Sequence, residues 1–317
     1  MAHNLESMFY VANDEMGNPS KRLVPWHGLG TPVKEALTST EAIELAGLNW
    51  EVIQKPIFTE DKRIPNYMAN VRSSDNSVLG VVTDSYKIVQ NSEAFAFTDS
   101  LFDEGVRYET AGSLRGGKTI WLLARMPREK ILDDDIDPYL VFTNSHDGTG
   151  AIKVAITPIR VVCNNTLNLA LSQAKRSWST KHMGSMQAKL EEAKHTLGFA
   201  NKYMGSLNEE ADRLVNSSIS FSEVEEVIKE MFPIDEDASD RQKANIKKVH
   251  DDIMVCYFAP DIKKYIDTKY GFINAVADWC GHAEPSRRTA DYNANNWGRI
   301  MGGHPVLDKA YELVCAK

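Results

Sequence analysis

The first half of the chain alternates apolar with polar residues, whereas the second half repeats its apolar residues every three or four positions. The alternating pattern is typical of β-strands, and the three-and-four spacing is typical of amphipathic helices. Segments that predict strands lie at 50–58, 66–72, 78–83, 106–112, 118–126, 139–145 and 151–162. Turn formers at 74–77, 115–117 and 146–150 join six of these segments into antiparallel hairpins.

Helices are predicted mainly beyond residue 185, at 186–204, 207–216, 222–232, 241–258 and 272–280. Two shorter helices are predicted at 39–46 and 92–103. Thr38 and Glu41 form a capping box for the first of them, and Gly47 ends it. A further helix is expected to begin at the cap-forming residues 164–166.

Two segments predict irregular structure. The first 35 residues are rich in turn formers around 25–32, which predicts a packed loop, and an acidic loop is expected at 133–137. The whole pattern predicts an α+β fold, in which an antiparallel, hairpin-rich N-terminal half packs with a mostly helical C-terminal half. We expect a core domain with the sheet at 1–187 and a helical region at 188–317, packed on that core.

The composition is that of a folded globular protein, with 43% hydrophobic and 25% charged residues. No apolar run approaches the roughly 18 residues that a membrane helix needs. The N-terminus lacks a basic segment followed by an apolar one, so no signal peptide is expected. The four cysteines form no CxxC pair, which is typical of free thiols in a reducing compartment. These features predict a cytoplasmic protein.

The charge is unevenly distributed. The net charge of −8 argues against a generic polyanion binder. Residues 148–190, however, contain six Lys or Arg and no Asp or Glu. One interpretation is a buried strand, which excludes acids and keeps its few cations at the edges. The other is a surface that faces an anion, where a carboxylate would repel phosphate.

The segment 175–182 contributes most to the anion-facing interpretation. Basic residues flank Trp178, and small hydroxyl residues fill the gaps, which suits phosphate contacts with one base stacked on the ring. The alternative is a solvated helix end whose tryptophan packs on the core. The candidate nucleic-acid contacts are Arg160, Lys175, Arg176, Trp178 and Lys181, with Lys153, Arg115 and Lys118 as further candidates. Because 153 and 160 differ by an odd number, a regular strand would place them on opposite faces, unless Pro158 breaks it.

Residues 112–119 match the phosphate-loop pattern GxxxxGK[ST]. A true phosphate loop follows a buried strand and opens a helix, whereas the flanking segments here predict strands. We therefore expect a glycine hairpin turn with Arg115 and Lys118 exposed. Nucleotide binding by an enzyme through this turn is kept as an alternative.

No catalytic residue, metal site or cofactor is predicted. Ser145, His146 and Asp147 are consecutive at a hairpin tip, so they do not form a nucleophile–base pair. Cys163 is expected to be a buried thiol. Cys280 and His282 would need two further ligands to hold a metal ion, such as His304 and Cys315.

Several longer segments carry a family resemblance. They are PWHGLGTPV (25–33), TDSYKIVQNSEAF (83–95), AGSLRGGKTIWLLARMP (111–127), TNSHDGTGAIKVAITPIRVVCNNTLNLAL (143–171) and TKYGFINAVADW (268–279). Together they resemble the phage- and plasmid-related family described as domain of unknown function 932. The resemblance implies a protein of bacteria or their phages, located in the bacterial cytoplasm, and it brings no established activity.

A likeness of fold suggests an activity. Antiparallel hairpins followed by a helix, with basic residues at the junction, are similar to the core of phage single-strand annealing proteins, which assemble into rings or filaments. Our first hypothesis is therefore a homo-oligomeric phage or mobile-element protein that binds nucleic acid without catalysis, with single-stranded DNA favoured, and that serves recombination or replication. The alternative is a protein-interaction factor acting on a host defence or replication complex. Its contact surface would be the acidic helical half, with Glu209, Glu210, Asp212, Glu223, Glu225 and Glu226.

Overall fold

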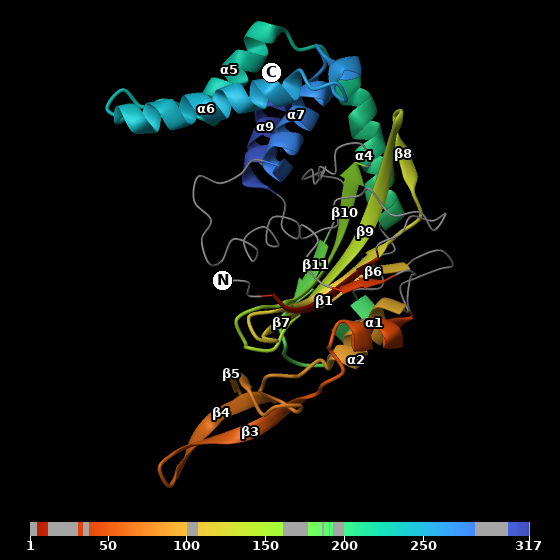
Figure 1. Ribbon diagram of the computed structural model, residues 1–317, viewed down its shortest axis with the longest axis vertical. Helices are drawn as coiled ribbons and strands as arrows, with labels where there is room; N and C mark the ends of the chain where they lie inside the picture. Colours follow the sequence, from red (N-terminus) through yellow and green to blue (C-terminus); the bar gives the residue numbers. More distant parts are fainter. Residues whose placement is uncertain are drawn as a thin grey trace.

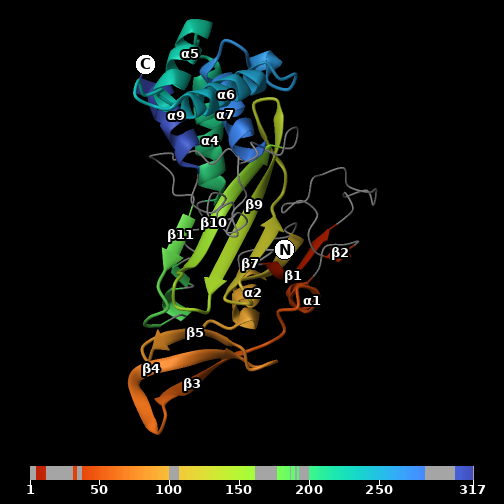
Figure 2. The same cartoon turned by 60° about the vertical axis from the view of Figure 1, so that its left-hand side comes forward.

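The computed structural model describes residues 5–11, 31–33, 38–99, 107–160, 177–185, 187–189, 191–192, 200–282 and 304–316. The molecule is elongated, with a large sheet in the middle, a group of helices at one end and a small sheet at the other (Figure 1). The turned view in Figure 2 shows the same order of the three parts. The structure therefore confirms the predicted α+β fold, with antiparallel sheets in the N-terminal half and mostly helices in the C-terminal half.

The large sheet has eight strands, and seven of them follow the order β11-β10-β9-β7-β6-β1-β2, while β8 pairs with β9. Every pairing is antiparallel except the parallel pair of β1 and β2. The strands are β1 (Leu5–Val11), β2 (Thr31–Val33), β6 (Arg107–Leu114), β7 (Thr119–Arg125), β8 (Glu129–Ile131), β9 (Asp134–Ser145), β10 (Ile152–Arg160) and β11 (Ser177–Thr180).

Both faces of this sheet are buried at its centre. Leu122, Phe142 and Val154 lie in one cross-strand row and belong to the main hydrophobic core. Their sequence neighbours Trp121 and Val141 point to the opposite face and are also fully buried. Burial on both faces explains why the centres of β7 and β9 are nearly continuous apolar runs instead of clean alternations.

The small sheet is an antiparallel meander of β3 (Val52–Thr59), β4 (Lys62–Arg72) and β5 (Val78–Thr83). Its inner face, with Val52, Asn70 and Val82, is buried. Two short helices, α1 (Ser39–Leu45) and α2 (Asn91–Asp99), lie next to each other near the junction of the two sheets (Figure 1). The predicted capping box of α1 is present, and Gly47 follows the helix with a φ of 64°, as a helix-ending glycine does.

The helical region comprises α4 (Ala200–Val215), α5 (Phe221–Met231), α6 (Asp240–Tyr257), the 3₁₀ turn η1 (Lys263–Tyr265), α7 (Lys269–His282) and α9 (Pro305–Ala316). Helix α4 runs without a break through 204–207, where two separate helices were predicted. Helices α5 and α6 begin with capping boxes that pair Ser220 with Glu223 and Ser239 with Gln242. In the part of the chain that the structure describes, no helix is long and apolar enough to cross a membrane.

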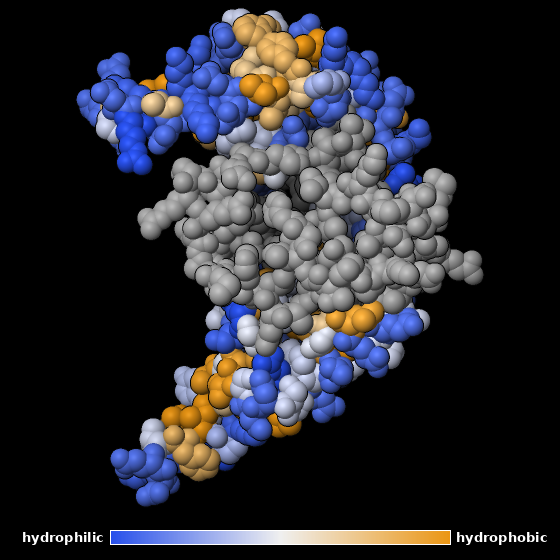
Figure 3. All heavy atoms as spheres, in the orientation of Figure 1, coloured by the Kyte–Doolittle hydropathy of each residue, from blue (hydrophilic) through white to orange (hydrophobic). Residues whose placement is uncertain are grey.

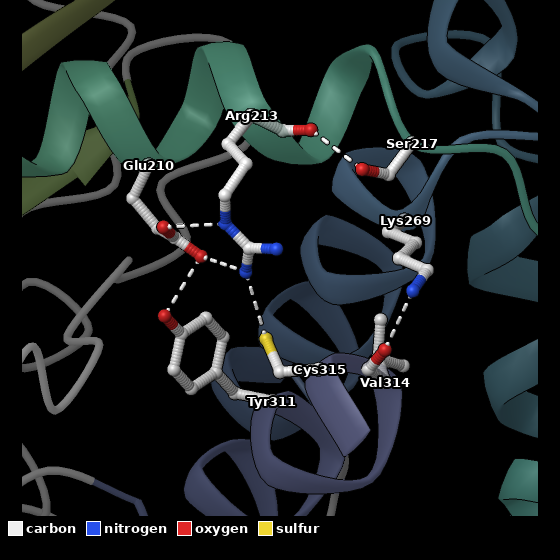
Figure 4. A network of polar contacts seen from close by, with 7 residues as sticks. All are labelled: Glu210, Arg213, Ser217, Lys269, Tyr311, Val314 and Cys315. Carbon is white, nitrogen blue, oxygen red and sulfur yellow. Dashed lines mark hydrogen bonds and ion pairs between the residues drawn. The ribbon is translucent and has the colours of Figure 1, made fainter. Parts of the chain in front are cut away.

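Polar contacts hold α4 against α9 (Figure 4). The Arg213 guanidinium donates to both carboxylate oxygens of Glu210, at 2.9 and 2.6 Å, and to Cys315 Sγ at 3.1 Å. The Tyr311 hydroxyl donates to the same carboxylate at 2.7 Å. Burial of Glu210 opposes its ionisation, but the hydrogen bonds from Arg213 and Tyr311 lower its pKa, so the carboxylate stays charged.

Two predictions of irregular structure were wrong. Part of the first 35 residues forms β1 and β2, because β6 offers a strand edge on which β1 pairs from Leu5 to Tyr10. The expected acidic loop at 133–137 instead begins β9, with Asp134 and Asp137 buried. These two carboxylates can lie in a buried strand because Lys264 Nζ is 3.0 Å from Asp134 and Arg128 Nε is 2.8 Å from Asp137.

Candidate nucleic-acid interface

Four of the predicted basic residues lie at one end of the large sheet, the end that meets the small sheet. We call this group, Arg115, Lys118, Lys153 and Lys181, the basic hairpin end. Arg115 and Lys118 are in the turn between β6 and β7, and the amide of His146 in the next hairpin donates to the Lys118 carbonyl at 2.7 Å. Lys153 pairs with Ser179 across β10 and β11, and Lys181 directly follows β11. The β6–β7 turn, the start of β10 and the end of β11 therefore bring these cations to one end of the large sheet.

The cations of this group are available to solvent. Arg115, Lys153 and Lys181 are exposed, and Lys118 is half-buried. Among the described residues, no carboxylate forms an ion pair with Lys118, Lys153 or Lys181. Lys189 adds a further positive charge, since its Nζ donates to the Lys181 carbonyl at 3.0 Å.

One carboxylate, that of Asp147, lies among these cations. Burial opposes its ionisation, but hydrogen bonds from Ser145 and Thr149, together with the charge of Arg115, lower its pKa. Asp147 Oδ1 accepts from Ser145 Oγ at 2.6 Å and from the Thr149 amide and hydroxyl at 2.9 and 2.7 Å. The carboxylate thus holds the β9–β10 turn in shape, and its hydrogen bonds are used within that turn.

The remaining candidates do not join this group. Arg160 pairs with Ile136 at the opposite end of β10, and the register from Lys153 to Arg160 is unbroken through Pro158. Seven residues of strand correspond to about 23 Å, so Arg160 is near the helical region instead. Lys175 and Arg176 lie outside the described residues, as do Cys163 and the helix predicted from residue 164.

Trp178 packs on the hydrophobic core and does not offer its ring to a ligand. It lies on β11 opposite Val154, in the core-facing row, and only 8% of its surface is exposed. A ring in this position has no open face for a base. The segment 177–180 is a strand and not a helix end, and its alternation places Trp178 inward while Ser177 and Ser179 are exposed.

The glycine turn at 115–117 is a hairpin turn, as expected. Arg115, Gly116 and Gly117 have φ values of 55°, 70° and 83°, and β7 begins two residues later. A Cβ at position 117 would lie 3.2 Å from both Arg72 Nη1 and the Trp50 ring, so the small sheet packs closely on this turn. The turn is followed by a strand, so the helix N-terminus that a phosphate loop uses is missing here.

The junction between the two sheets is a buried polar cluster that the sequence pattern did not predict. His146 and His182 are buried, at 0% and 3% exposure. Asn70 Nδ2 donates to the His146 carbonyl at 2.7 Å, and the Tyr86 hydroxyl donates to the Ser145 carbonyl. The Tyr86 ring stacks on His182 with ring centroids 4.5 Å apart. These contacts dock the small sheet on the β9–β10 turn.

Both imidazoles are neutral at physiological pH. Burial, and then the nearby His182, lower the pKa of His146 to about 3, although Asp147 opposes this. Burial also lowers the pKa of His182, helped by the charge of Lys189 and opposed by the hydrogen bond to the Lys87 carbonyl. In the sequence, His146 lies within the polar run SHDGTG (145–150). That run predicts a turn and gives no indication that the histidine is buried.

The hydrogen bonds of the two rings define their tautomers. Asn91 Nδ2 donates to backbone carbonyls, so its Oδ1 accepts from His146 Nε2 at 2.9 Å. His182 Nδ1 donates to the Lys87 carbonyl at 2.9 Å. Each ring therefore keeps one buried lone pair, on His146 Nδ1 and His182 Nε2, and neither has a partner among the described residues. Asn70 Oδ1 and Asn144 Oδ1 are likewise buried acceptors without a donor in the described part of the chain.

Neither a hydrolytic triad nor a metal site is formed by the described residues. His146 is bonded to Asn91, while Ser145 Oγ donates to Asp147, so the imidazole does not face the serine hydroxyl as a triad requires. Cys280 Sγ lies 3.5 Å from His304 Nδ1, but Cys315 contacts Arg213 instead. No group of three or more His, Cys, Asp or Glu side chains within the described ranges could hold a metal ion.

The protein therefore has an α+β fold, in which a small sheet packs against one end of a large sheet and a helical region lies at the other end. A family model described as "Domain of unknown function (DUF932)" matches residues 78–301. The match covers more than half of the 317 residues, so the chain belongs to this family. No curated protein and no solved structure matches the chain.

Proposed function

We propose that this protein binds nucleic acid without catalysis, with single-stranded DNA as the favoured ligand, and that it does so at the basic hairpin end. The observation that supports the proposal is the grouping of Arg115, Lys118, Lys153 and Lys181 at one end of the large sheet, in the β6–β7 turn, near the start of β10 and directly after β11. Cations without carboxylate partners are the main source of affinity for a phosphate backbone.

The distribution of charge over the molecule suits this role. The net charge of −8 repels a polyanion from most of the surface, and a local group of cations would direct it to one place. We further propose that the protein belongs to a phage or another mobile element, works in the bacterial cytoplasm and assembles with copies of itself. These proposals extend the family resemblance, whose description assigns no activity.

The proposal is tested by the salt dependence of binding. Fluorescence anisotropy with a labelled single-stranded oligonucleotide should show affinity that falls steeply as salt rises. Lys153→Ala/Lys181→Ala should lower the affinity and reduce the slope of log K against log salt by about 0.7 for each phosphate that the variant no longer neutralises. Unlabelled duplex DNA and RNA serve as competitors.

The control variant is Lys247→Ala/Lys248→Ala on α6, which removes the same charge from an exposed site in the helical region. It should bind as the wild type does. Lys175→Ala/Arg176→Ala tests the two candidates for which only sequence reasoning is available. Absence of binding by the wild type at low salt would contradict the proposal.

A protein-interaction role is the alternative, and one observation favours it. Exposed carboxylates lie on two consecutive helices of the helical region, Asp212 on α4 and Glu225 and Glu226 on α5. A host protein captured from nuclease-treated lysate by the wild type, and not captured by Glu225→Lys/Glu226→Lys, would support this alternative.

A further inference from the structure

An exposed tyrosine on the small sheet stands out once Trp178 is known to be buried. Among the described residues, the exposed aromatic side chains are Phe58, Tyr67, Phe221 and Phe258, at 56%, 47%, 48% and 55% exposure. The first two lie on the small sheet, and the other two lie on the helical region, with ring centroids 6.2 Å apart. These pairs are the available places for an aromatic ring to meet a ligand.

Cross-strand pairing defines the outer face of the small sheet. Ala69 on β4 pairs with Lys55 on β3 and with Val81 on β5. Tyr67 is two residues from Ala69 and therefore shares its face, at a diagonal distance of about 7–8 Å from Lys55 and Val81. The residues of the opposite parity, Val52, Asn70 and Val82, are those that face the large sheet. Tyr67 thus lies on the exposed part of this face, opposite Thr83 at the end of β5, whereas Val71 on the same face is buried.

The outer face is apolar as well as exposed. Ile53, Tyr67, Val78 and Val81 are 43%, 47%, 58% and 56% exposed. Figure 3 shows apolar side chains gathered over the small sheet, with hydrophilic residues at the tip of the β3–β4 hairpin. A three-stranded sheet that leaves one apolar face in water is a place where a ligand or partner binds.

Charge distinguishes the two aromatic pairs. All charged residues within β3, β4 and β5 are basic, namely Lys55, Lys62, Arg63 and Arg72. The carboxylates of this sheet lie outside the strands, at Glu51, Glu60, Asp61, Asp75 and Asp84, and Asp75 is ion-paired with Arg72 at 2.6 Å. Phe221, by contrast, begins a helix whose charged residues are mostly acidic. The strands of the small sheet are therefore compatible with a polyanion, whereas the acidic residues of α5 repel one near Phe221.

The small sheet is also continuous with the basic hairpin end. A Cβ at Gly80 would lie 2.5 Å from Asp147 Cα, and one at Gly117 would lie 3.2 Å from Arg72 Nη1. The β9–β10 turn therefore packs directly against β5, and the β6–β7 turn, which carries Arg115 and Lys118, packs against β4. Phe58 and Tyr67 are therefore the exposed aromatic residues on the sheet that these turns contact.

We propose that the outer face of the small sheet is a base-stacking surface for single-stranded nucleic acid, with Tyr67 as the ring on which a base stacks and Lys55 beside it for phosphate. This inference rests on the proposed function and adds its missing aromatic contact. Stacking on an aromatic side chain does not depend on base identity, because every base has a π-face. The surface therefore binds single strands with little sequence preference.

Tyr67→Ser tests the inference with labelled oligothymidylate and an abasic oligomer of equal length. The variant should bind oligothymidylate about fivefold to a hundredfold more weakly than the wild type. Its salt slope should be unchanged, because a stacked ring releases no counterions. Affinity for the abasic oligomer should not change, and Tyr67→Phe should restore the wild-type affinity. Phe58→Ser provides a second variant on the same sheet, and thermal melting checks that each variant is folded.

Phe221→Ser is the matched control, because its exposure nearly equals that of Tyr67 and it lies on the acidic helical region. It should bind as the wild type does. If Tyr67→Ser and Phe58→Ser keep full affinity while Lys153→Ala/Lys181→Ala loses it, the stacking surface is wrong and the proposed function stands. If Tyr67→Ser instead lowers the oligomeric mass in analytical ultracentrifugation without changing affinity, the stacking surface is again wrong, and the face is an interface between copies of the chain. If the wild type does not bind the oligonucleotide, both proposals fail.

Discussion

Strand β9 runs from the helical region to the small sheet, and it buries polar side chains of different kinds at its two ends. Near the helical region, the carboxylates of Asp134 and Asp137 face Lys264 and Arg128. Near the small sheet, Asn144 and His146 are neutral and are bonded to the Val89 carbonyl and to the Asn91 side chain. One end therefore depends on paired charges and the other on amide and imidazole hydrogen bonds, which predicts different responses to mutation and to pH.

The largest effect is expected from Gly80→Ala at the neutral end. A Cβ there would meet three backbone atoms of Asp147 at 2.5 to 2.8 Å, and backbone cannot give way as a flexible side chain can. We expect a loss of about 3 kcal/mol in the free energy of unfolding, measured by urea denaturation. Gly205→Ala in α4 is the control, since nothing lies within 4 Å of its Cβ and alanine favours a helix by up to about 1 kcal/mol. Equal effects of the two changes would show that the sheets do not dock as described.

A smaller loss is expected from Arg128→Ala at the charged end. The change leaves Asp137, whose side chain is 4% exposed, without its guanidinium partner. Breaking a fully buried pair costs about 3–5 kcal/mol, and we expect about 2 kcal/mol because Arg128 is 42% exposed. Lys130→Ala removes the exposed, 3.7 Å pair with Asp135 and should cost under about 0.5 kcal/mol. A loss for Arg128→Ala no greater than that of Lys130→Ala would contradict the importance of the buried carboxylate.

The smallest expected effect is a pH dependence of stability that comes from the neutral end of β9. The pKa of His146 is lowered to about 3 in the folded protein, whereas an unfolded histidine titrates near 6.5. The unfolded state therefore binds the proton first, and stability falls as pH drops from about 6.5 towards 3. Between pH 6 and pH 5 the loss from His146 should be about 1 kcal/mol, measured by urea denaturation at both pH values.

His146→Gln should remove the part of this pH dependence that comes from His146, while His250→Gln in the helical region should leave that part in place. The lowered pKa of His182 acts in the same direction, and its contribution remains in the His146 variant. Direct titration of the His146 ring by NMR gives an independent check that does not require the variant to fold. A folded-state pKa close to 6.5 would contradict the burial of a neutral ring at this junction.

The elements of the fold could be predicted well where local chemistry decides them. The Thr38–Glu41 capping box, the glycine at position 47 and the turns at 115–117 and 146–150 act within a few residues, and all are present. The strand β1 could not be found in this way, because its segment becomes a strand only by pairing with β6, about a hundred residues later. Asp134 and Asp137 were misjudged for a similar reason, since their partners decide their burial.

In the candidate site, too, some features could be predicted from local sequence and others depend on long-range contacts. Sequence alone singled out the cations at 153 and 181 from the acid-free stretch, and those at 115 and 118 from the glycine turn, because neither pattern requires a fold to be seen. It could not decide between stacking and packing for Trp178, because the segment becomes the strand β11 only by pairing with β10, and this pairing decides which face of the ring is covered. Tyr67 was not singled out, since its exposure depends on the small sheet having one open face.

By itself, the sequence determined the fold class, the hairpins, the starts of α1, α5 and α6 to within one residue, and the presence of an acid-free basic stretch at 148–190. These follow from backbone preferences and charges that act over a few residues. Only the tertiary structure decided which cations meet, that Trp178 and His146 are buried and that Tyr67 faces solvent. Those outcomes depend on contacts between residues far apart in the chain, and a side chain's burial is a property of its neighbours in space.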